Sequence, residues 1–271
     1  MIKMNFYTFF NLKYIFYRNK SFIWDSSKKR LEIIKKIKSI NIELLIGINR
    51  QKNTLLNNTI NFAKGNFTNN ALLWGARGNG KSTLIKTIFN LISKDYSSLK
   101  LIQLNKNNIQ DIEKIYSIID NFKELRFILF IDDLSYEKND NDYKIIKSTL
   151  EGSIRNQPRN IIQYITSNRR HLMPRDMIDN ERSSAIHTDE SVEEKISLSD
   201  RFGLWIGFHN ISQEVYLNII KSYCNHYKID YSNEELNDSI KWSIQRGNRT
   251  GRSAWQYIIE LASKKNLKIN F

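Results

Sequence analysis

Cysteine is almost absent from this chain, whose 271 residues include a single one, Cys224. An internal disulfide framework is therefore excluded, and the four scattered histidines lack the spacing of a zinc site. So little cysteine fits a reducing compartment, and we expect a cytoplasmic protein.

Long apolar runs are lacking as well. The aromatic-rich residues 1–24 are interrupted by lysine and asparagine, and no small-residue cleavage site follows them. They are too short and too polar to span a membrane, so we expect no integral membrane association. A peripheral contact with a membrane stays open.

Acidic residues are scarce at both ends of the chain. The formal net charge is +14, of which residues 1–40 carry +8 and residues 241–271 carry +6, while the residues between them sum to zero. Such basic ends favour a nucleic acid or another polyanion as a partner. The lysine-, isoleucine- and asparagine-rich composition of an AT-rich genome produces the same pattern, so charge alone leaves the partner open.

The most specific motif lies at residues 75–82, which read Gly-Ala-Arg-Gly-Asn-Gly-Lys-Ser. They match every fixed position of the phosphate-loop pattern G-x-x-x-x-G-K-[ST]. An apolar run precedes the motif and a segment of helical periodicity follows it, as such a loop requires. The glycines let the backbone approach an anion, and the helix start supplies unpaired N–H groups. We expect Lys81 to reach the β- and γ-phosphates of a nucleoside triphosphate and the Ser82 hydroxyl to bind Mg²⁺.

Apolar runs and helical periodicities alternate through the middle of the chain. Strands are expected at residues 71–74, 99–104, 127–131, 161–166 and 203–208. Helices are expected at residues 49–64, 81–94, 109–122, 142–155, 213–226, 232–245 and 253–264, and a long polar loop at residues 173–197. This order predicts an α/β fold, a P-loop NTPase whose parallel sheet is flanked by helices and followed by a small C-terminal helical lid.

Three parts of the chain are expected. Residues 1–41 would form a basic, partly helical extension, residues 42–211 the nucleotide-binding domain and residues 212–271 the lid. In the extension, Asp25 or Ser26 is placed to cap a helix that reaches about residue 40. The apolar side of this helix would hold Leu31, Ile34, Ile37 and, less regularly, Ile33 and Ile40.

Acidic and amide side chains follow two of the expected strands. The unbroken apolar run at residues 127–131 ends in Asp132 and Asp133. An acid at the end of a buried strand beside the phosphate loop is placed to hold Mg²⁺, which we assign to Asp132. Asp133 would polarise the attacking water, or else cap a turn. Asn168 follows the next strand and would bind the γ-phosphate or orient that water, or else be an ordinary turn residue.

Two arginine sites complete the set. Arg201 lies just before the last strand, and Arg249 and Arg252 lie at the start of the last helix. A guanidinium group on the γ-phosphate neutralises charge that develops in the transition state. The alternative for each is an arginine at the surface or in an ion pair, and the choice between Arg249 and Arg252 as the lid arginine stays open.

The order of these parts resembles that of the AAA+ ATPases. The string GARGNGKS looks like Walker A, FILFIDD like Walker B, TSN like sensor 1, DRF like the arginine-finger segment and GNRTGR like sensor 2. Upstream, LLIGI looks like the loop that packs on adenine. Most of residues 42–271 is also similar to an uncharacterised bacterial family of predicted AAA+ ATPases, a domain of unknown function, in strings such as NNALLWGARGNGKS and EKISLSDRFGLWIGF.

The resemblance implies ATP and Mg²⁺ as ligands and a homo-oligomer with sites at subunit interfaces. By the same resemblance Arg201 acts in trans on a neighbour's γ-phosphate, and Arg252 acts in cis from the lid. Asp133 stands where many AAA+ proteins have a catalytic glutamate, and its shorter side chain favours slow, switch-like turnover. The residues expected to bind the nucleotide are Gly47, Ile48, Gly75, Ala76, Arg77, Gly78, Asn79, Gly80, Lys81, Ser82, Thr83 and Arg252.

Three functions compete at this point. The leading interpretation is an ATPase of the AAA+ type that remodels or loads an unknown protein or nucleic-acid client. The second is a nucleotide-dependent switch or assembly module with little hydrolysis. A small-molecule kinase is the third, and it leaves the ordered set of Asn168, Arg201 and Arg252 unexplained.

Overall fold

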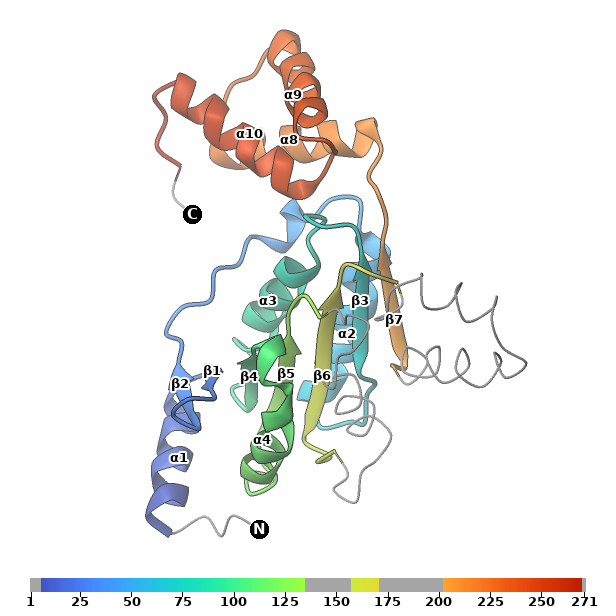
Figure 1. Cartoon of the computed structure of the whole chain (residues 1–271). Helices are drawn as coiled ribbons and strands as arrows, with labels where there is room; N and C mark the ends of the chain where they lie inside the picture. Colours follow the sequence, from blue (N-terminus) through green and yellow to red (C-terminus); the bar gives the residue numbers. More distant parts are fainter. Residues whose placement is uncertain (1–5, 135–156, 171–201, 270–271) are drawn as a thin grey trace, which may run out of the picture.

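The computed structural model of the chain describes residues 6–134, 157–170 and 202–269. Its strands form one sheet in the order β2-β1-β4-β5-β6-β3-β7, parallel except for the β1–β2 pair (Figure 1). The strands are β1 (Ser21–Asp25), β2 (Arg30–Ile33), β3 (Ala71–Gly75), β4 (Leu99–Leu104), β5 (Arg126–Ile131), β6 (Ile161–Ser167) and β7 (Leu204–Phe208). The helices are α1 (Phe6–Arg18), α2 (Asn49–Ala63), α3 (Lys81–Ile92), α4 (Ile112–Ile119), α8 (Gln213–Tyr227), α9 (Asn233–Gln245) and α10 (Gly251–Lys264).

The central strands are buried on both faces, as their apolar runs predict. In β5 the side chains of Phe127, Leu129 and Ile131 join a first core under α1 and α4. Those of Ile128 and Phe130 join a second core under α2 and α3. Alternate residues of a strand point to opposite faces, so one continuous apolar run supplies both cores. The five strands expected from the sequence are confirmed.

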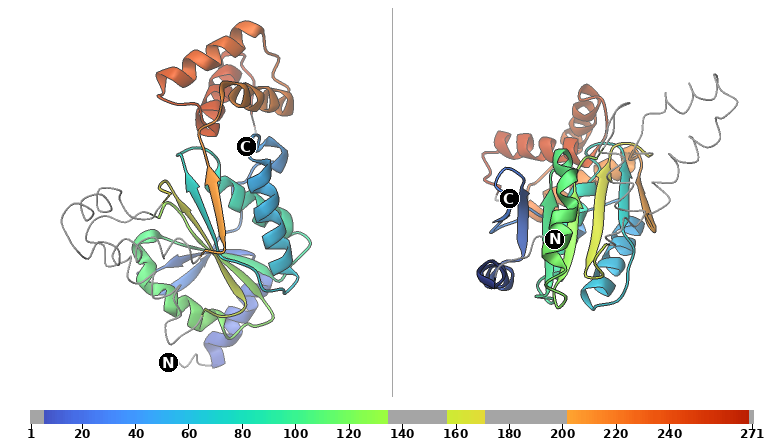
Figure 2. Two further views of the ribbon diagram at one scale, coloured as in Figure 1. Left: turned by 90° about the vertical axis from the view of Figure 1, so that its right-hand side faces the viewer. Right: turned by 60° about the horizontal axis from the view of Figure 1, so that its bottom comes forward.

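The helix expected near residues 26–40 is wrong, because this segment begins with the turn and the second strand of a β-hairpin. Strand β1 pairs in parallel with β4 and in antiparallel with β2, so the hairpin extends the sheet at one edge (Figure 2, right). Phe22 and Trp24 are buried two residues apart in the first core. Their spacing is that of a strand. Burying these two aromatic side chains stabilises the hairpin more than a helix with the later isoleucines on one face would be stabilised.

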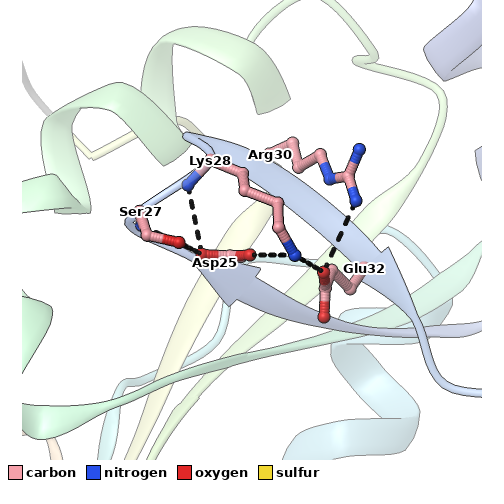
Figure 3. Close-up of polar contacts among 5 residues, drawn as sticks. All are labelled: Asp25, Ser27, Lys28, Arg30 and Glu32. Atoms are coloured by element: carbon pink, nitrogen blue, oxygen red, sulfur yellow. Dashed lines mark hydrogen bonds and ion pairs between the residues drawn. The ribbon is translucent and has the colours of Figure 1, made fainter.

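Asp25 caps the hairpin turn instead of a helix, as Figure 3 shows. Its Oδ1 accepts hydrogen bonds from the hydroxyl and N–H groups of Ser27 and from the N–H group of Lys28. These bonds, that of the Ser27 hydroxyl above all, hold the pKa of Asp25 below its usual range. Glu32 forms ion pairs with Lys28 and Arg30. Short aspartate side chains commonly stabilise turns in this way.

The C-terminal helices α8, α9 and α10 form a separate bundle around a third core (Figures 1 and 2). Capping boxes start two of them, with Ser232 before α9 and Thr250 before α10. The bundle lies beyond the end of the sheet at which β7 continues into α8. The three helices expected here are confirmed, whereas the helix expected at residues 142–155 and the loop expected at residues 173–197 lie outside the described residues. Among the helices that the structure describes, none combines the length and apolarity needed to cross a bilayer.

Candidate nucleotide-binding site

The phosphate loop joins β3 to α3 and encloses its own lysine. Gly80 stands at the N-cap of α3 with a φ of 90°, a conformation that strains any residue with a side chain. Lys81 starts the helix and is 7% exposed. Its Nζ donates to the carbonyl oxygens of Gly75 at 2.7 Å and Ala76 at 2.8 Å, and to Asn168 Oδ1 at 3.2 Å. The ammonium group is therefore held inside the loop.

The charges around Lys81 favour an anion. Burial lowers the pKa of Lys81 to about 8, while the carboxylates of Asp133 and Asp132 oppose this shift. Arg77 and Arg252 lower the pKa further by repulsion. Three cationic side chains thus face two carboxylates, and a polyphosphate would favour the charged form of the lysine.

Two hydroxyl groups converge on Asp132, which follows β5. Ser82 Oγ donates to Asp132 Oδ1 at 2.5 Å, and Thr166 Oγ1 donates to the same oxygen at 2.6 Å. The described residues include no group of three or more His, Cys, Asp or Glu side chains placed to hold a metal. Mg²⁺ needs no such group, because it usually takes one or two carboxylates and completes its octahedron with water and substrate phosphates. Ser82 and Asp132 fit that donor set.

The next acid, Asp133, has a left-handed backbone conformation with a φ of 54°. For a residue with a side chain this conformation costs about 1–3 kcal/mol and persists only where neighbours hold it. Here the N–H group of Asp133 donates to Thr166 Oγ1 at 2.8 Å, and its carboxylate accepts from Asn168 Nδ2. Asn168 therefore links Lys81 with Asp133 across the ends of β5 and β6. The sequence analysis gave Thr166 no role of its own, although the TSN string begins with it.

The phosphate loop also contacts the segment that leads into the C-terminal bundle. Asn79 is 8% exposed and donates from Nδ2 to the carbonyl oxygen of His209 at 2.8 Å. The carbonyl oxygen of Gly78 accepts from the N–H group of Arg252 at 3.1 Å. A Cβ atom at Gly78 would lie 3.0 Å from the Thr250 hydroxyl. Glycine at this position thus lets the loop and the start of α10 touch.

A cavity of about 690 Å³ opens between the phosphate loop and the bundle, a size typical of ligand pockets. Its polar end holds the phosphate loop together with Asp132, Asp133, Thr166 and Asn168. Its apolar end is lined by Leu44, Leu45, Ile46, Ile48, Ile211, Ile219, Tyr223 and Trp255. The rings of Tyr223 and Trp255 lie 5.3 Å apart. A polar end joined to an apolar, aromatic end suits a phosphorylated base.

Most of the predicted site residues meet at this cavity. It is lined by Ile48, Arg77, Gly78, Asn79, Gly80, Lys81, Ser82, Thr83, Asp132, Asp133, Asn168 and Arg252. Gly75 and Ala76 contribute only their carbonyl oxygens to Lys81. Gly47 faces Val215, outside the lining.

The predicted arginines and two further lysines differ in how they lie relative to the cavity. Arg249 does not line the cavity and donates to Gln213 at 3.3 Å, whereas Arg252 lines the cavity. Arg201 lies outside the described residues. The lining also includes Lys38 and Lys86, which no motif indicated.

A family model described as "Protein of unknown function (DUF815)" matches residues 17–265. The chain belongs to the DUF815 family. No curated protein matches this DUF815 chain.

Solved structures show the fold of this DUF815 chain. The Thermotoga maritima RuvB Holliday junction branch migration motor is 16% identical, with a TM-score of 0.55 over 85% of this chain and 68% of RuvB. Domain III of the Thermotoga maritima replication initiation protein DnaA is 13% identical, with a TM-score of 0.52 over 85% and 93%. A chain of the E. coli MS115-1 HORMA:CdnC:Trip13 complex is 12% identical, with a TM-score of 0.51 over 81% and 90%. The fold is that of a AAA+ P-loop protein.

Proposed function

We propose that this DUF815 protein is a Mg²⁺-dependent ATP-binding protein and an ATPase of the AAA+ type. The observation that carries the proposal is the convergence of Lys81, Ser82, Asp132 and Asn168 at one end of the cavity. Hydrogen bonds of 2.5 Å and 3.2 Å already join them in two pairs. Lys81 and the N–H groups of the loop would bind the β- and γ-phosphates. Ser82 and Asp132 would hold Mg²⁺, which supplies charge neutralisation when it is bound.

Hydrolysis requires an oriented water and a partner for the charge that develops on the γ-phosphate. Asp133 would accept a hydrogen bond from that water, and Asn168 would orient it. Arg252 would reach the γ-phosphate in cis, since its own backbone is bonded to Gly78 of the phosphate loop. In a homo-oligomer, Arg201 of a neighbouring copy would supply a second guanidinium group in trans.

The base would occupy the apolar end of the cavity. Leu45 and Ile48 approach it from the loop before α2, and Tyr223 and Trp255 approach it from the bundle. Because both parts of the chain would contact the same base, nucleotide binding would draw the bundle and the sheet domain together. This movement is the step that we propose is coupled to an unknown macromolecular client. RuvB is a Holliday junction branch migration motor and DnaA a replication initiation protein, and the basic ends of this chain are compatible with a nucleic-acid client without selecting one.

A slow nucleotide switch is the second candidate, and the geometry of Asp133 favours it. The carboxylate accepts a hydrogen bond from Asn168, and Thr166 holds its backbone in the left-handed region. A short side chain restrained in this way reaches less far toward the γ-phosphate than glutamate would. In this case turnover would only reset the bound state.

The first experiment measures binding of ATP with Mg²⁺ by calorimetry. Lys81→Ala should lose at least tenfold in affinity, because it removes the one cation enclosed by the loop. Lys64→Ala is the matched control, since Lys64 is exposed at the end of α2 and does not line the cavity. Retained affinity in Lys81→Ala would refute the nucleotide site.

The second experiment measures ATP turnover alone and with single-stranded DNA, double-stranded DNA and RNA at two salt concentrations. Stimulation that fades as salt rises would support a nucleic-acid-coupled ATPase. Tight binding with slow turnover that no nucleic acid changes would favour the switch.

A further inference from the structure

A second cavity, of about 380 Å³, adjoins the nucleotide cavity where the phosphate loop meets the loop between α9 and α10. We call it the arginine cavity. It is lined by Arg77, Gly78, Arg246, Asn248, Thr250, Arg252, Ser253 and Gln256. Within the described part of the chain this lining contains three arginines and no acidic residue. Arg77 and Arg252 border both cavities, whereas Arg246 borders the arginine cavity alone.

The three arginines are not neutralised by ion pairs within the described part of the chain. None of the ion pairs among the described residues involves Arg77, Arg246 or Arg252. The charges of Arg77 and Arg252 reach as far as Lys81, which they make harder to protonate. Like charges gathered at a cavity repel one another, and an anion between them removes that repulsion.

The guanidinium group of Arg246 is also held in place. It stacks on the ring of Trp242, with its Cζ 3.3 Å from the ring centroid. Stacking on an aromatic face fixes the plane of the guanidinium group and leaves its edge free to donate. A planar, fixed fork of this kind suits bidentate contact with phosphate oxygens.

We infer that the arginine cavity binds a phosphate-class oxyanion while a nucleotide occupies the neighbouring site. The inference rests on the proposed nucleotide function through the two shared arginines. Because a water takes about 30 Å³ of liquid, a cavity of about 380 Å³ has room for one phosphate with part of its hydration shell. Thr250 and Ser253 bond to each other in the capping box, so the arginines and the amides of Asn248 and Gln256 are the donors at hand.

The position of the cavity gives such an anion a structural effect. One wall is the phosphate loop, and the other is the loop that starts α10. An anion bound to Arg77 and Arg246 together would tie these walls to each other, in parallel with the bond between Arg252 and Gly78. The bundle would then stay closed on the nucleotide longer. The anion is either free phosphate, as released by hydrolysis, or a backbone phosphate of a nucleic acid.

The test saturates the protein with Mg²⁺ and a β,γ-imido analogue of ATP, which fills the γ-phosphate position. Inorganic phosphate is then titrated in and its binding measured by calorimetry. Wild-type protein should bind one phosphate per chain, and Arg246→Gln should bind it at least tenfold more weakly. Arg249→Gln is the matched control, because it removes the same charge from the same loop without touching the cavity. It should bind phosphate as the wild type does.

Two further readings decide the source of the anion. If a single-stranded oligonucleotide displaces phosphate from the wild type, and Arg246→Gln binds that oligonucleotide more weakly, the cavity is assigned to a backbone phosphate. Phosphate binding that the oligonucleotide does not displace would assign it to free phosphate.

Other results would overturn the inference. These are the absence of phosphate binding to analogue-loaded protein, phosphate binding only when the analogue is left out, or equal effects of the two glutamine variants. Failure of the analogue itself to bind would be a different result, since it refutes the proposed function before phosphate is added.

Discussion

Replacing Phe16 with alanine tests whether α1 belongs to the core that supports the nucleotide site. Phe16 is fully buried, at 0% exposure. Its ring lies edge-on to those of Phe22, Phe122 and Phe127, with centroid distances of 5.1, 5.0 and 5.1 Å. Truncating a buried phenylalanine to alanine costs about 3–5 kcal/mol of unfolding free energy, because transfer energy is lost and a cavity remains. With three aromatic partners, we expect the upper half of that range.

A loss of this size is large against the whole stability of a protein, which is about 5–15 kcal/mol. Each kcal/mol shifts the unfolding midpoint of a chain this long by about 2–4 °C, so we expect a fall of about 8–20 °C. Thermal unfolding followed by circular dichroism measures the shift, and urea unfolding measures the free energy. Tyr14→Ala is the matched control on the same helix, since Tyr14 is 59% exposed.

The control should change stability by no more than about 0.5 kcal/mol. A Phe16→Ala variant within about 1 kcal/mol of wild type, or no less stable than Tyr14→Ala, would refute the placement of α1 in the core.

Three further predictions concern the site. Thr166→Val removes a hydroxyl bond to Asp132 and should slow ATP turnover about tenfold or more with affinity kept within about threefold, measured by phosphate release and calorimetry. Asp133→Asn should keep ATP binding and lower turnover about 10²-fold or more if Asp133 polarises the water, whereas unchanged turnover would favour the switch. Arg201→Ala should bind ATP without turning it over, and mixing it with Lys81→Ala should restore part of the turnover. No restoration at any mixing ratio would argue against an arginine that acts in trans.

The parallel sheet and the phosphate loop could be predicted because their signals are local. Strands buried on both faces appear as apolar runs, and residues 75–82 contain every fixed position of their motif. Asp132 and Asn168 were found from their positions after such runs. Parallel strands bring their carboxyl ends to one edge, so chain order alone places these side chains together.

The rest depends on contacts between distant segments. Strand β1 pairs with β4, about 80 residues later in the chain. The alternation of Phe22 and Trp24 is compatible with a strand, but nothing in residues 21–25 indicates which strand they pair with. The bond from Asn79 to His209 joins the phosphate loop to a residue 130 positions away, in the segment that leads into the bundle. The helices of the bundle were predicted correctly, but this contact with the phosphate loop was not. Local periodicity carries no information on such pairings, which is why the helix expected near residues 26–40 was wrong.

The pairing of β1 with β4 also sets an order of events during synthesis. Phe22 lies beside Ile102, about 80 residues later, and Phe16 needs Phe127 as well. At about 5–20 residues per second, the first aromatic side chains leave the ribosome roughly 5–20 s before their partners do. The bundle helices, by contrast, meet neighbours made within moments of each other. The beginning of this chain is therefore the part that a nascent-chain chaperone would hold longest.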